Sequence, residues 1–266
     1  MRKIYIYSNG TDASQIACKQ IHAGFTKAGF EVASEFGPDI AFIVCVGGDG
    51  TLLRLLPTLG YPKTPIIGVN TGHVGFFQEF EVSEIDAMVK LCAGGEYSLQ
   101  HHKLLRAEVC KDGKVIGEHW SINDVTIRNN ISKLTHLRVS IGDTFIERFS
   151  GDGVIISTPV GSTAYNYSVG GAIIDPRNDV LQLSPIAPMN SVAFRSFTSS
   201  LLLPSDLEAV ITPDEGFERT AIVILDGFEF RYEDFDEIRV GMPGEEAVIV
   251  RSANYDFWSK VTEKFL

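Results

Sequence analysis

The stretch that most constrains the fold runs from Ile40 to Arg54 and reads IAFIVCVGGDGTLLR. Its first half, residues 40–46, is an unbroken apolar run rich in β-branched residues, which is typical of a strand buried on both faces of a parallel sheet. Its second half, residues 51–56, has helical spacing and stops at Pro57. The turn between them therefore lies where a strand gives way to a helix, which is where ligands bind in open α/β sheets.

Three glycines surround one aspartate in this turn, Gly47-Gly48-Asp49-Gly50. Glycine has no Cβ and accepts positive φ, so the loop can bend sharply and let a phosphate chain lie against backbone N–H groups. A carboxylate would repel phosphates unless it takes a proton from an attacking hydroxyl or binds a divalent metal. The alternative is a plain strand-to-helix turn that Asp49 caps. A cap explains the aspartate and one glycine but not three, so the sequence favours a functional loop.

Strands and helices alternate around this loop. We expect helices at residues 12–28, 51–56 and 83–93, and strands at residues 3–7, 30–34, 40–46 and 65–69. In the first helix, Ile16, Ile21, Phe25 and Ala28 are expected on the buried face, and Gly29 is expected to end the helix. This alternation predicts a parallel sheet with helices on its faces. The glycine loops that follow residues 46 and 69 should then border one crevice.

The pattern changes near residues 97–102, where short alternating segments and hairpin turns begin. We expect strands at residues 104–110, 114–120, 125–127, 134–141, 145–149, 154–157, 209–212, 221–225, 228–232, 237–240 and 247–251. Residues 255–266 have the spacing of an amphipathic helix. The sequence thus predicts an α/β N-terminal domain with a parallel sheet over residues 1–99. A mainly antiparallel, β-rich C-terminal domain should cover residues 100–252.

Composition limits the choice of partners. The 266 residues include 23 Lys and Arg against 34 Asp and Glu, a net charge of −11. No overall basic field would therefore attract nucleic acid or an anionic membrane. No apolar run approaches transmembrane length, the N-terminus lacks a signal-peptide core, and the four cysteines form no CxxC pair. We expect a cytoplasmic protein that binds anionic substrates through local N–H groups and a metal ion.

Two polar turns in the second half could also bind a ligand. Asn123-Asp124 offers donors and acceptors that suit the hydroxyl pair of a ribose, and an Asx turn between strands fits this dipeptide equally well. Gly151-Asp152-Gly153 could accept a hydrogen bond from an amine or amide. Taken alone, it fits a hairpin turn better.

The run TPVGSTAY at residues 158–165 tips the balance toward function. Ser162 or Thr163 is expected to begin a short helix whose free N–H groups and hydroxyls would favour an anion. The adjacent ring of Tyr165 could stack on a base. Gly170-Gly171 would close this segment.

Together these motifs resemble a known family. GGDGT at residues 47–51 is shared by a kinase superfamily that includes NAD kinases, diacylglycerol and sphingosine kinases and phosphofructokinases. In order along the chain, the motifs Asn70-Thr71-Gly72-His73-Val74-Gly75-Phe76, Asn123-Asp124, GDGV at 151–154 and TPVGSTAY at 158–165 are similar to those of bacterial NAD kinases. The resemblance covers nearly the whole chain.

The resemblance implies transfer of the terminal phosphoryl group of ATP, or of polyphosphate, to the 2′-hydroxyl of the adenosine ribose of NAD, giving NADP. Asp49 would be the catalytic base, and Mg²⁺ or another divalent cation would assist. The family also implies a homotetramer in which a neighbouring subunit completes the substrate site, and a C-terminal helix, residues 253–266, that packs back on the first domain. Substrate-binding roles are implied for Gly47, Gly48, Gly50, Thr51, Arg54, Asn70, Asn123, Asp124, Ser150, Asp152, Thr163, Ala164, Tyr165, Asn166, Ser168 and Ala187.

The chain departs from the family pattern at Ser150, where members commonly carry Arg or Lys. That cationic contact is missing or comes from a neighbour such as Arg148. Smaller departures are Asp124 in place of Glu, Phe228 in place of Gln, and Val74 in place of Leu. His73 is expected to be a loop residue without a catalytic role.

Two other protein classes share some of these features. A lipid kinase of the diacylglycerol type would need an apolar or basic surface facing a membrane, and the acidic balance and TPVGSTAY speak against it. A catalytically silent NAD(P)-binding regulator would keep the dinucleotide pocket, and the intact GGDG loop speaks against it.

Overall fold

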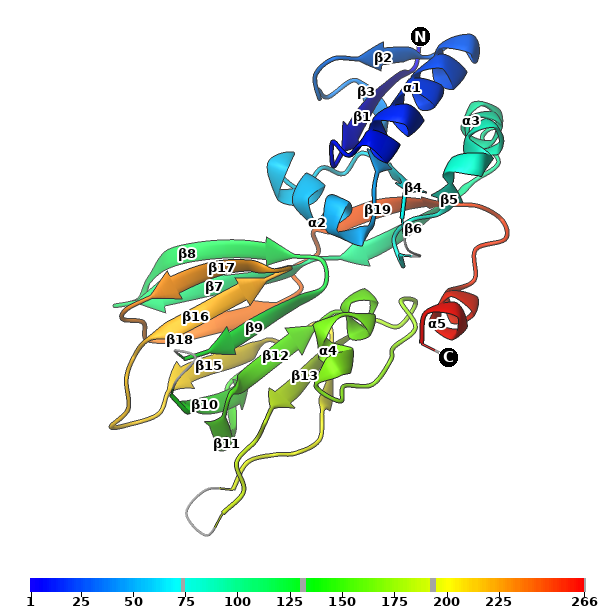
Figure 1. Cartoon of the computed structure of the whole chain (residues 1–266). Coiled ribbons are helices and arrows are strands. Elements are labelled where there is room, and N and C mark those ends of the chain that lie inside the picture. The colour runs from blue at the N-terminus through cyan, green and yellow to red at the C-terminus, as the bar shows by residue number, and fades with distance from the viewer. Residues whose placement is uncertain (73–74, 130–132, 192–194, 266) are drawn as a thin grey trace. The chain divides into compact units, whose positions relative to one another are not determined.

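The computed structural model describes residues 1–72, 75–129, 133–191 and 195–265 of the chain. The chain forms two compact units, shown as a cartoon in Figure 1. The first unit comprises Met1–His102 and Glu246–Leu266, and the second comprises Lys103–Glu245. None of the described helices is long and apolar enough to cross a membrane.

The first unit is built on one sheet. Its strands are β1 (Lys3–Ser8), β2 (Glu31–Ala33), β3 (Ile40–Val46), β4 (Ile66–Asn70), β5 (Phe80–Glu81), β6 (Ser98–Lys103) and β19 (Glu246–Arg251). In the described residues their order is β2-β1-β3-β4-β19-β6, with β5 paired to β4. The pairs β1–β2, β1–β3, β3–β4, β4–β5 and β4–β19 are parallel, which confirms the predicted α/β architecture.

The first unit also contains helices. They are α1 (Asp12–Lys27), α2 (Asp49–Thr58), α3 (Ile85–Gly94), preceded by the 3₁₀ turn η1 (Val82–Glu84), and α5 (Phe257–Phe265). The helices α1 and α3 share one apolar cluster with the strands and lie together in Figure 1. The side chain of Thr11 caps α1. Gly29 follows the helix at φ 84°, as expected for the residue that ends it.

Two details of the helices differ from expectation. Ile16 is 58% exposed, whereas Ser14, Ala17, Ile21 and Phe25 form the buried stripe of α1, which has the i, i+3, i+7 and i+11 spacing of one helix face. The expected inward positions of Ile16 and Ala28 were therefore wrong. Pro57 does not stop α2 but lies inside its last turn.

The second unit is a sandwich of two antiparallel sheets. Among its described residues, the strand order is β11-β10-β15-β18-β7-β8 in the first sheet and β14-β13-β12-β9-β16-β17 in the second. A single apolar cluster contains residues from both sheets, so their inner faces share a core. The elements are β7 (Leu105–Lys111), β8 (Lys114–Ser121), β9 (Asp124–Arg128), β10 (Thr135–Ile141), β11 (Thr144–Gly151), β12 (Gly153–Ser157), η2 (Val160–Thr163), α4 (Tyr165–Ser168), β13 (Val180–Ile186), β14 (Leu201–Pro204), β15 (Ala209–Pro213), β16 (Ala221–Leu225), β17 (Phe228–Tyr232) and β18 (Glu237–Gly241).

The division of the chain differs from the expected boundaries at residues 99 and 252. Strands β6 and β19 join the first sheet, so the chain passes into the second unit after His102 and leaves it at Glu245. Residues 247–251 were assigned to the wrong domain because an apolar strand does not encode which sheet it joins. Its buried run, Ala247–Arg251, suits a strand inside a parallel sheet.

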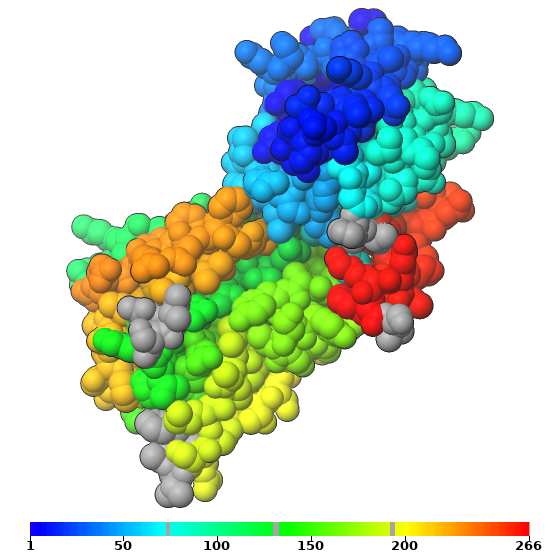
Figure 2. Space-filling model, viewed as in Figure 1, coloured from blue at the N-terminus to red at the C-terminus, as the bar shows by residue number. Residues whose placement is uncertain are grey.

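The C-terminal helix α5 belongs to the first unit, as predicted. It buries Phe257 and Val261, and the rings of Phe257 and Phe265 each lie 5.9 Å from that of Phe76. Trp258 is 47% exposed, and α5, in red, forms part of the surface in Figure 2. The aromatic contacts fasten this helix beside the loop that follows β4.

The buried stripe of α1 predicts a sharp contrast between two substitutions. Phe25→Ala should lower the free energy of unfolding by about 3–5 kcal/mol, because Phe25 is fully buried and its ring meets that of Phe30 edge-on at 5.1 Å. Ile16→Ala on the same helix should change it by less than about 0.5 kcal/mol. Urea denaturation measures both values, and similar losses in the two variants would contradict this packing.

Candidate active site

The GGDG loop joins β3 to α2. The N–H of Gly47 donates to the carbonyl of Val69 on β4 at 2.9 Å. At this glycine φ is 151°, and a Cβ would lie 2.1 Å from Oγ1 of Thr51. A Cβ on Gly48 or Gly50 would meet nothing within 4 Å. The fold therefore requires glycine at position 47, whereas at 48 and 50 the side of the loop that a Cβ would occupy is open.

Asp49 is the first residue of α2, but its side chain does not cap that helix. Its two carboxylate oxygens instead accept hydrogen bonds from the loop after β4, Oδ2 from the N–H of Phe76 at 2.9 Å and Oδ1 from the N–H of Phe77 at 3.1 Å. Nζ of Lys264, on α5, lies 3.8 Å from Oδ2. The capping alternative for Asp49 is therefore wrong, and the carboxylate is oriented by a second loop.

Gly75 makes this arrangement possible. A Cβ at this position would lie 2.2 Å from Oδ1 of Asp49. Only a residue without a side chain lets the two loops approach this closely. The two glycine-rich stretches of the sequence thus meet at neighbouring parallel strands.

Asn70 organises the start of the second loop. Its Nδ2 donates to the carbonyl of Gly72 at 3.1 Å and to Oε1 of Glu81 at 3.0 Å, and its Oδ1 accepts from the N–H of Gly72 at 3.1 Å. With 2% of its surface exposed, Asn70 shapes the loop from within. Thr51 is buried and Arg54 exposed on α2. His73 and Val74 lie outside the described residues.

In the second unit Asp226 holds the turn before β9. Its Oδ1 accepts from Oγ of Ser121 at 2.7 Å and from the N–H of Asn123 at 2.9 Å, and its Oδ2 accepts from the N–H of Ile122 at 2.8 Å. Asp226 itself has φ 50°, a backbone geometry that aspartate tolerates better than most residues. The sequence showed it only as an Asp-Gly turn, and its role became visible through these three donors.

Asp124 is buried beside Asp226. Burial, followed by the charge of Asp226, raises the pKa of Asp124 to about 8. Burial also raises the pKa of Asp226, but its hydrogen bonds from Ser121 and from the backbone oppose that shift. With a pKa of about 8, Asp124 is mostly protonated at neutral pH. A protonated Asp124 can donate as well as accept a hydrogen bond.

The TPVGSTAY segment packs on the same turn. The N–H and Oγ1 of Thr158 donate to the carbonyl of Asn123 at 2.9 and 3.3 Å. A Cβ on Gly161 would lie 2.0 Å from that carbonyl oxygen. The carboxyl end of β12 thus brings together Asn123, Asp124 and the segment from Thr158 to Ser168. Figure 1 shows α4, the last part of this segment, beside β12.

The expected helix start at Ser162 or Thr163 was wrong. The 3₁₀ turn η2 begins at Val160, and α4 follows Ala164 with only four residues. The hydroxyls are also engaged: Oγ of Ser162 donates to the carbonyl of Pro159 at 2.6 Å, and Oγ1 of Thr163 donates to that of Val160 at 3.2 Å. These side chains hold the segment together instead of presenting free donors.

In α4 only Asn166 is buried, and the other side chains are exposed. Tyr165 is 45% exposed and Ser168 is also exposed, whereas Asn166 is fully buried and its Oδ1 accepts from Oγ of Ser184 at 2.7 Å. Tyr165 is therefore accessible to a ligand. Asn166 links the short helix to β13 through this hydrogen bond.

The remaining predicted residues lie at the opposite end of β12. Ser150 and Asp152 precede this strand, and the carbonyl of Ala187 would be 2.8 Å from a Cβ on Gly151. Asp152 is separated from Thr158 by about 20 Å of extended chain, at about 3.3 Å per residue. Within one copy of the second unit, the predicted nucleotide-binding residues thus form two separate groups.

The second group has its own contacts. Oγ of Ser150 lies 2.8 Å from Nδ1 of His136, Asp152 is exposed, and Ala187 has φ 43°. Arg148, the alternative source of a cationic contact, lies with its Nε 3.3 Å from Oδ1 of Asp214. Ser150 therefore supplies no positive charge at this position, and its hydroxyl lies within hydrogen-bond distance of His136.

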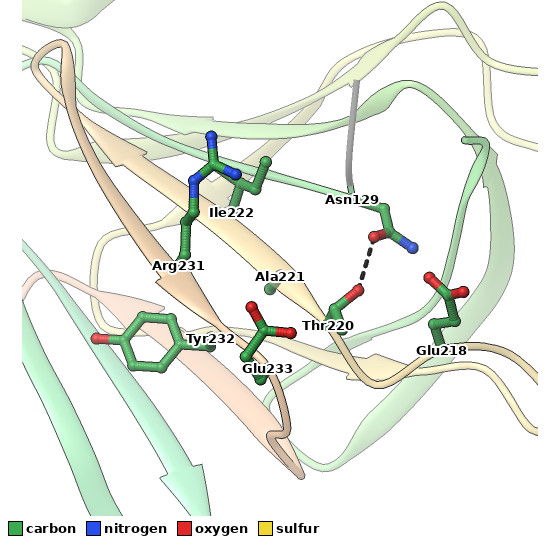
Figure 3. Close-up of a pocket in the computed structure, with 8 residues that line it drawn as sticks. All are labelled: Asn129, Glu218, Thr220, Ala221, Ile222, Arg231, Tyr232 and Glu233. Carbon is green, nitrogen blue, oxygen red and sulfur yellow. Dashed lines mark hydrogen bonds between the residues drawn. The ribbon is translucent and has the colours of Figure 1, made fainter. Parts of the chain in front are cut away.

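A pocket of about 280 Å³ elsewhere in the second unit contains none of the predicted residues. Figure 3 shows it beside β16 and β17, with Oγ1 of Thr220 donating to Oδ1 of Asn129 at 2.7 Å. Two carboxylates, Glu218 and Glu233, line it together with Arg231. The described residues that line this pocket include no glycine loop for a phosphate chain, so we do not take it for the active site.

The raised pKa of Asp124 predicts a pH-dependent stability. Folding favours its protonated form, so the stability that it contributes is fully present below the unfolded pKa near 4 and is lost as pH rises toward its folded pKa of about 8. Asp124→Asn should therefore gain stability over the wild type as pH rises from 5 to 8, by at most about 1.4 kcal/mol per pH unit, and level off above 8.

Denaturant unfolding between pH 5 and 9 measures this trend. Asp206→Asn, at an exposed aspartate of the same unit, controls for the loss of one negative charge. A difference between Asp124→Asn and wild type that stays constant across this range would contradict the assignment.

Comparison with known families matches both halves of the chain. The model of the ATP-NAD kinase N-terminal domain matches residues 1–97, and that of the ATP-NAD kinase C-terminal domain matches residues 122–252. The NAD kinase of Finegoldia magna is 31% identical over 266 residues, covering 99% of this chain and 97% of that protein. NAD kinase 1 of Listeria innocua is 32% identical over 269 residues, covering 99% of each chain.

Two solved structures share the fold. Yeast NADH kinase, complexed with NADH, has a TM-score of 0.82 at 23% identity and covers 99% of this chain and 87% of its own. An NAD kinase from Archaeoglobus fulgidus in complex with ATP has a TM-score of 0.76 at 23% identity and covers 100% of this chain and 97% of its own. Family models, whole-length relatives and fold agree, and the chain belongs to the NAD kinase family.

Proposed function

We propose that this protein transfers the terminal phosphoryl group of ATP to the 2′-hydroxyl of the adenosine ribose of NAD, giving NADP. The observation that carries this proposal is the orientation of Asp49. A carboxylate that headed α2 only as a cap would bind its own helix, but that of Asp49 is bound by the N–H groups of Phe76 and Phe77. The carboxylate of Asp49 therefore lies next to a glycine loop of the kind that binds phosphates, already oriented to accept a proton.

In this mechanism Asp49 accepts the proton of the attacking hydroxyl. The backbone of Gly47, Gly48 and Gly50 lies against the transferring phosphoryl group, for which the open positions at 48 and 50 leave room. In-line phosphoryl transfer asks the protein for positioning and charge stabilisation more than for covalent chemistry. Two fixed hydrogen bonds to one carboxylate are suited to that task.

The second unit supplies groups that suit a dinucleotide. Asn123 and protonated Asp124 can share hydrogen bonds with a pair of ribose hydroxyls, and the exposed ring of Tyr165 can stack on a base. Asp226 acts behind them by fixing the backbone N–H groups of residues 122 and 123. Among the residues proposed from the sequence, we assign direct contacts to Asn123, Asp124, Ala164, Tyr165 and Ser168. Thr163 and Asn166 support the segment from within.

Ser150, Asp152 and Ala187 do not belong to the same group within one subunit. Their separation along β12 supports an oligomer in which one subunit's second group joins the first group of a neighbour. We propose the homotetramer that the family resemblance implies. Analytical ultracentrifugation measures the assembly, and a monomer with full activity would contradict this element of the proposal.

A divalent cation fits this site as a component of the phosphate donor. In the described residues no group of three or more His, Cys, Asp and Glu side chains could bind a metal ion. Mg²⁺ keeps several waters and is commonly bound through substrate phosphates, so we propose that it is carried by ATP and assign it no protein ligand. It would supply neutralisation of the charge on the phosphate oxygens.

Replacement of the base tests the proposal. Asp49→Asn should lower kcat for ATP-dependent NADP formation by at least about 10³-fold, because amide nitrogen cannot take the proton. NAD binding, measured by calorimetry, should change by less than about threefold. Asp12→Asn is the matched control, since Asp12 is also the first residue of a helix in the same unit and is exposed.

The outcomes separate the rival functions. Wild-type protein that binds NADP but forms none from NAD, with ATP or polyphosphate as donor, would show a regulator in place of an enzyme. Phosphorylation of diacylglycerol by the wild type would favour the lipid kinase. Near-normal turnover by Asp49→Asn would contradict only the assignment of Asp49 as the base and would leave the proposed reaction in place.

A further inference from the structure

The loop Gly75–Glu79 is hydrogen-bonded on both of its sides. On one side, the N–H groups of Phe76 and Phe77 donate to Asp49. On the other side, the carbonyls of residues 75–78 accept from two cationic side chains. Nζ of Lys260 donates to the carbonyl of Gly75 at 3.3 Å and also to that of Gln78. Nη2 of Arg251 donates to the carbonyl of Phe76 at 3.1 Å, and Nη1 to that of Phe77 at 3.2 Å.

Two of these peptide groups connect a cation directly to Asp49. The carbonyl of Gly75 and the N–H of Phe76 are the two ends of one peptide group, which therefore joins Lys260 to Oδ2 of Asp49. The next peptide group, from Phe76 to Phe77, joins Arg251 to Oδ1 in the same way. A cation at the carbonyl end polarises the peptide group and strengthens its N–H as a donor.

Arg251 is fixed by its surroundings. It ends β19 with 2% of its side chain exposed, and its guanidinium lies 3.2 Å from Oε2 of Glu79 and 3.9 Å from the ring of Tyr255. Its Nε donates to Oε1 of Gln100 at 2.7 Å. Oε1 of Glu79 accepts from the N–H and Oγ of Ser252. Each of the three guanidinium nitrogens of Arg251 donates a hydrogen bond, which fixes the orientation of this buried group and of the loop carbonyls that it binds.

The stability of the fold does not by itself explain a lysine at position 260. Burial, followed by the charge of Arg251, lowers its pKa to about 8, against the opposing charges of Glu79, Asp49 and Glu263. An ammonium that is even half-buried is costly, and an apolar side chain would commonly stabilise such a position as well or better. The anchoring of α5 already comes from buried Phe257 and Val261. Anchoring alone therefore does not account for a lysine at this position.

We infer that Lys260 and Arg251 are positioning residues for Asp49, acting through the peptide groups of loop 75–77. The inference rests on the proposed function, in which Asp49 is the base that takes the proton from the substrate hydroxyl. Neither cation contacts the carboxylate: each binds the carbonyl end of a peptide whose other end holds one carboxylate oxygen. The C-terminal helix thus belongs to the catalytic apparatus although it lies some two hundred residues after Asp49 in the chain.

Lys260→Met tests this role, because Arg251 variants would leave Glu79 buried without its partner and could simply fail to fold. The variant should lower kcat by about 10- to 100-fold, while the KM values for NAD and ATP stay within about twofold, because Lys260 orients the base and binds neither substrate. Lys260→Arg should recover part of kcat. Val261→Ala is the matched control, since it weakens the packing of the same helix without removing a donor to the loop.

A pH profile adds a readout that helix anchoring would not move. Wild-type kcat should fall as pH rises through about 8, where the ammonium of Lys260 loses its proton among Arg251, Glu79, Asp49, Glu263 and the ring of Tyr255. Lys260→Arg should remove the part of this fall that does not come from Asp124, whose pKa is also about 8, since arginine stays protonated. An unchanged alkaline limb in Lys260→Arg would show that Lys260 does not act through its charge.

Amide hydrogen exchange tests the geometry without turnover. In Lys260→Met the N–H of Phe76 should exchange about tenfold faster, whereas that of Phe77, still linked to Arg251, should change less. Equal exchange of Phe76 in Lys260→Met and Val261→Ala would overturn the positioning role, even if the wild type made no NADP. Faster exchange with unchanged kcat would overturn its catalytic consequence, and absent wild-type turnover would instead refute the proposed function.

Discussion

The paired hydrogen bonds between the carboxylate of Asp49 and the amides of Phe76 and Phe77 are the interaction on which the first unit is organised. They require two neighbouring parallel strands, β3 and β4, that end at the same edge of the sheet. They also require a glycine at position 75, where a Cβ would collide with the carboxylate. The two glycine motifs are therefore two halves of one local structure.

The elements far along the chain serve the same arrangement. β19 pairs with β4 and delivers Arg251 to the carbonyl side of the loop, and α5 delivers Lys260 beside it. This explains why the chain returns to the first unit after the sandwich is complete. The second unit has a similar arrangement, in which the half-buried carboxylate of Asp226 accepts hydrogen bonds from the N–H groups of the turn that carries Asn123.

The sequence predicted the architecture because its signals were periodic. The apolar run of β3, the capped helix α1 and the hairpins of the sandwich all follow from hydrophobic spacing and turn residues. It failed for β13, which was not among the expected strands and which contains the polar residues Gln182 and Ser184. In the structure Gln182 is fully buried and bonds both the N–H and the carbonyl of Ala172. Such pairing cannot be recognised from residue type alone.

Site residues that belong to a sequence motif could be predicted. Site residues that come from distant parts of the chain could not. Asp49 and its glycines could be named from the sequence. The other residues had only weak local patterns: Arg251 ends an apolar strand, Lys260 lies one helical turn before a second lysine, and Asp226 begins an Asp-Gly turn. The positions of Ser150, Asp152 and Ala187, away from the other predicted residues, could not be foreseen either. Spacing along the chain does not tell which end of a strand a loop will occupy.

The most direct test of the proposed reaction follows the fate of the terminal phosphoryl group of ATP in a single turnover. The protein would be mixed in excess over NAD with ATP labelled at that group, and the products would be separated after quenching. We expect the label to appear in the dinucleotide as a 2′-phosphate at the rate at which NADP forms. Label found only in inorganic phosphate, with NAD unchanged, would contradict transfer to the ribose.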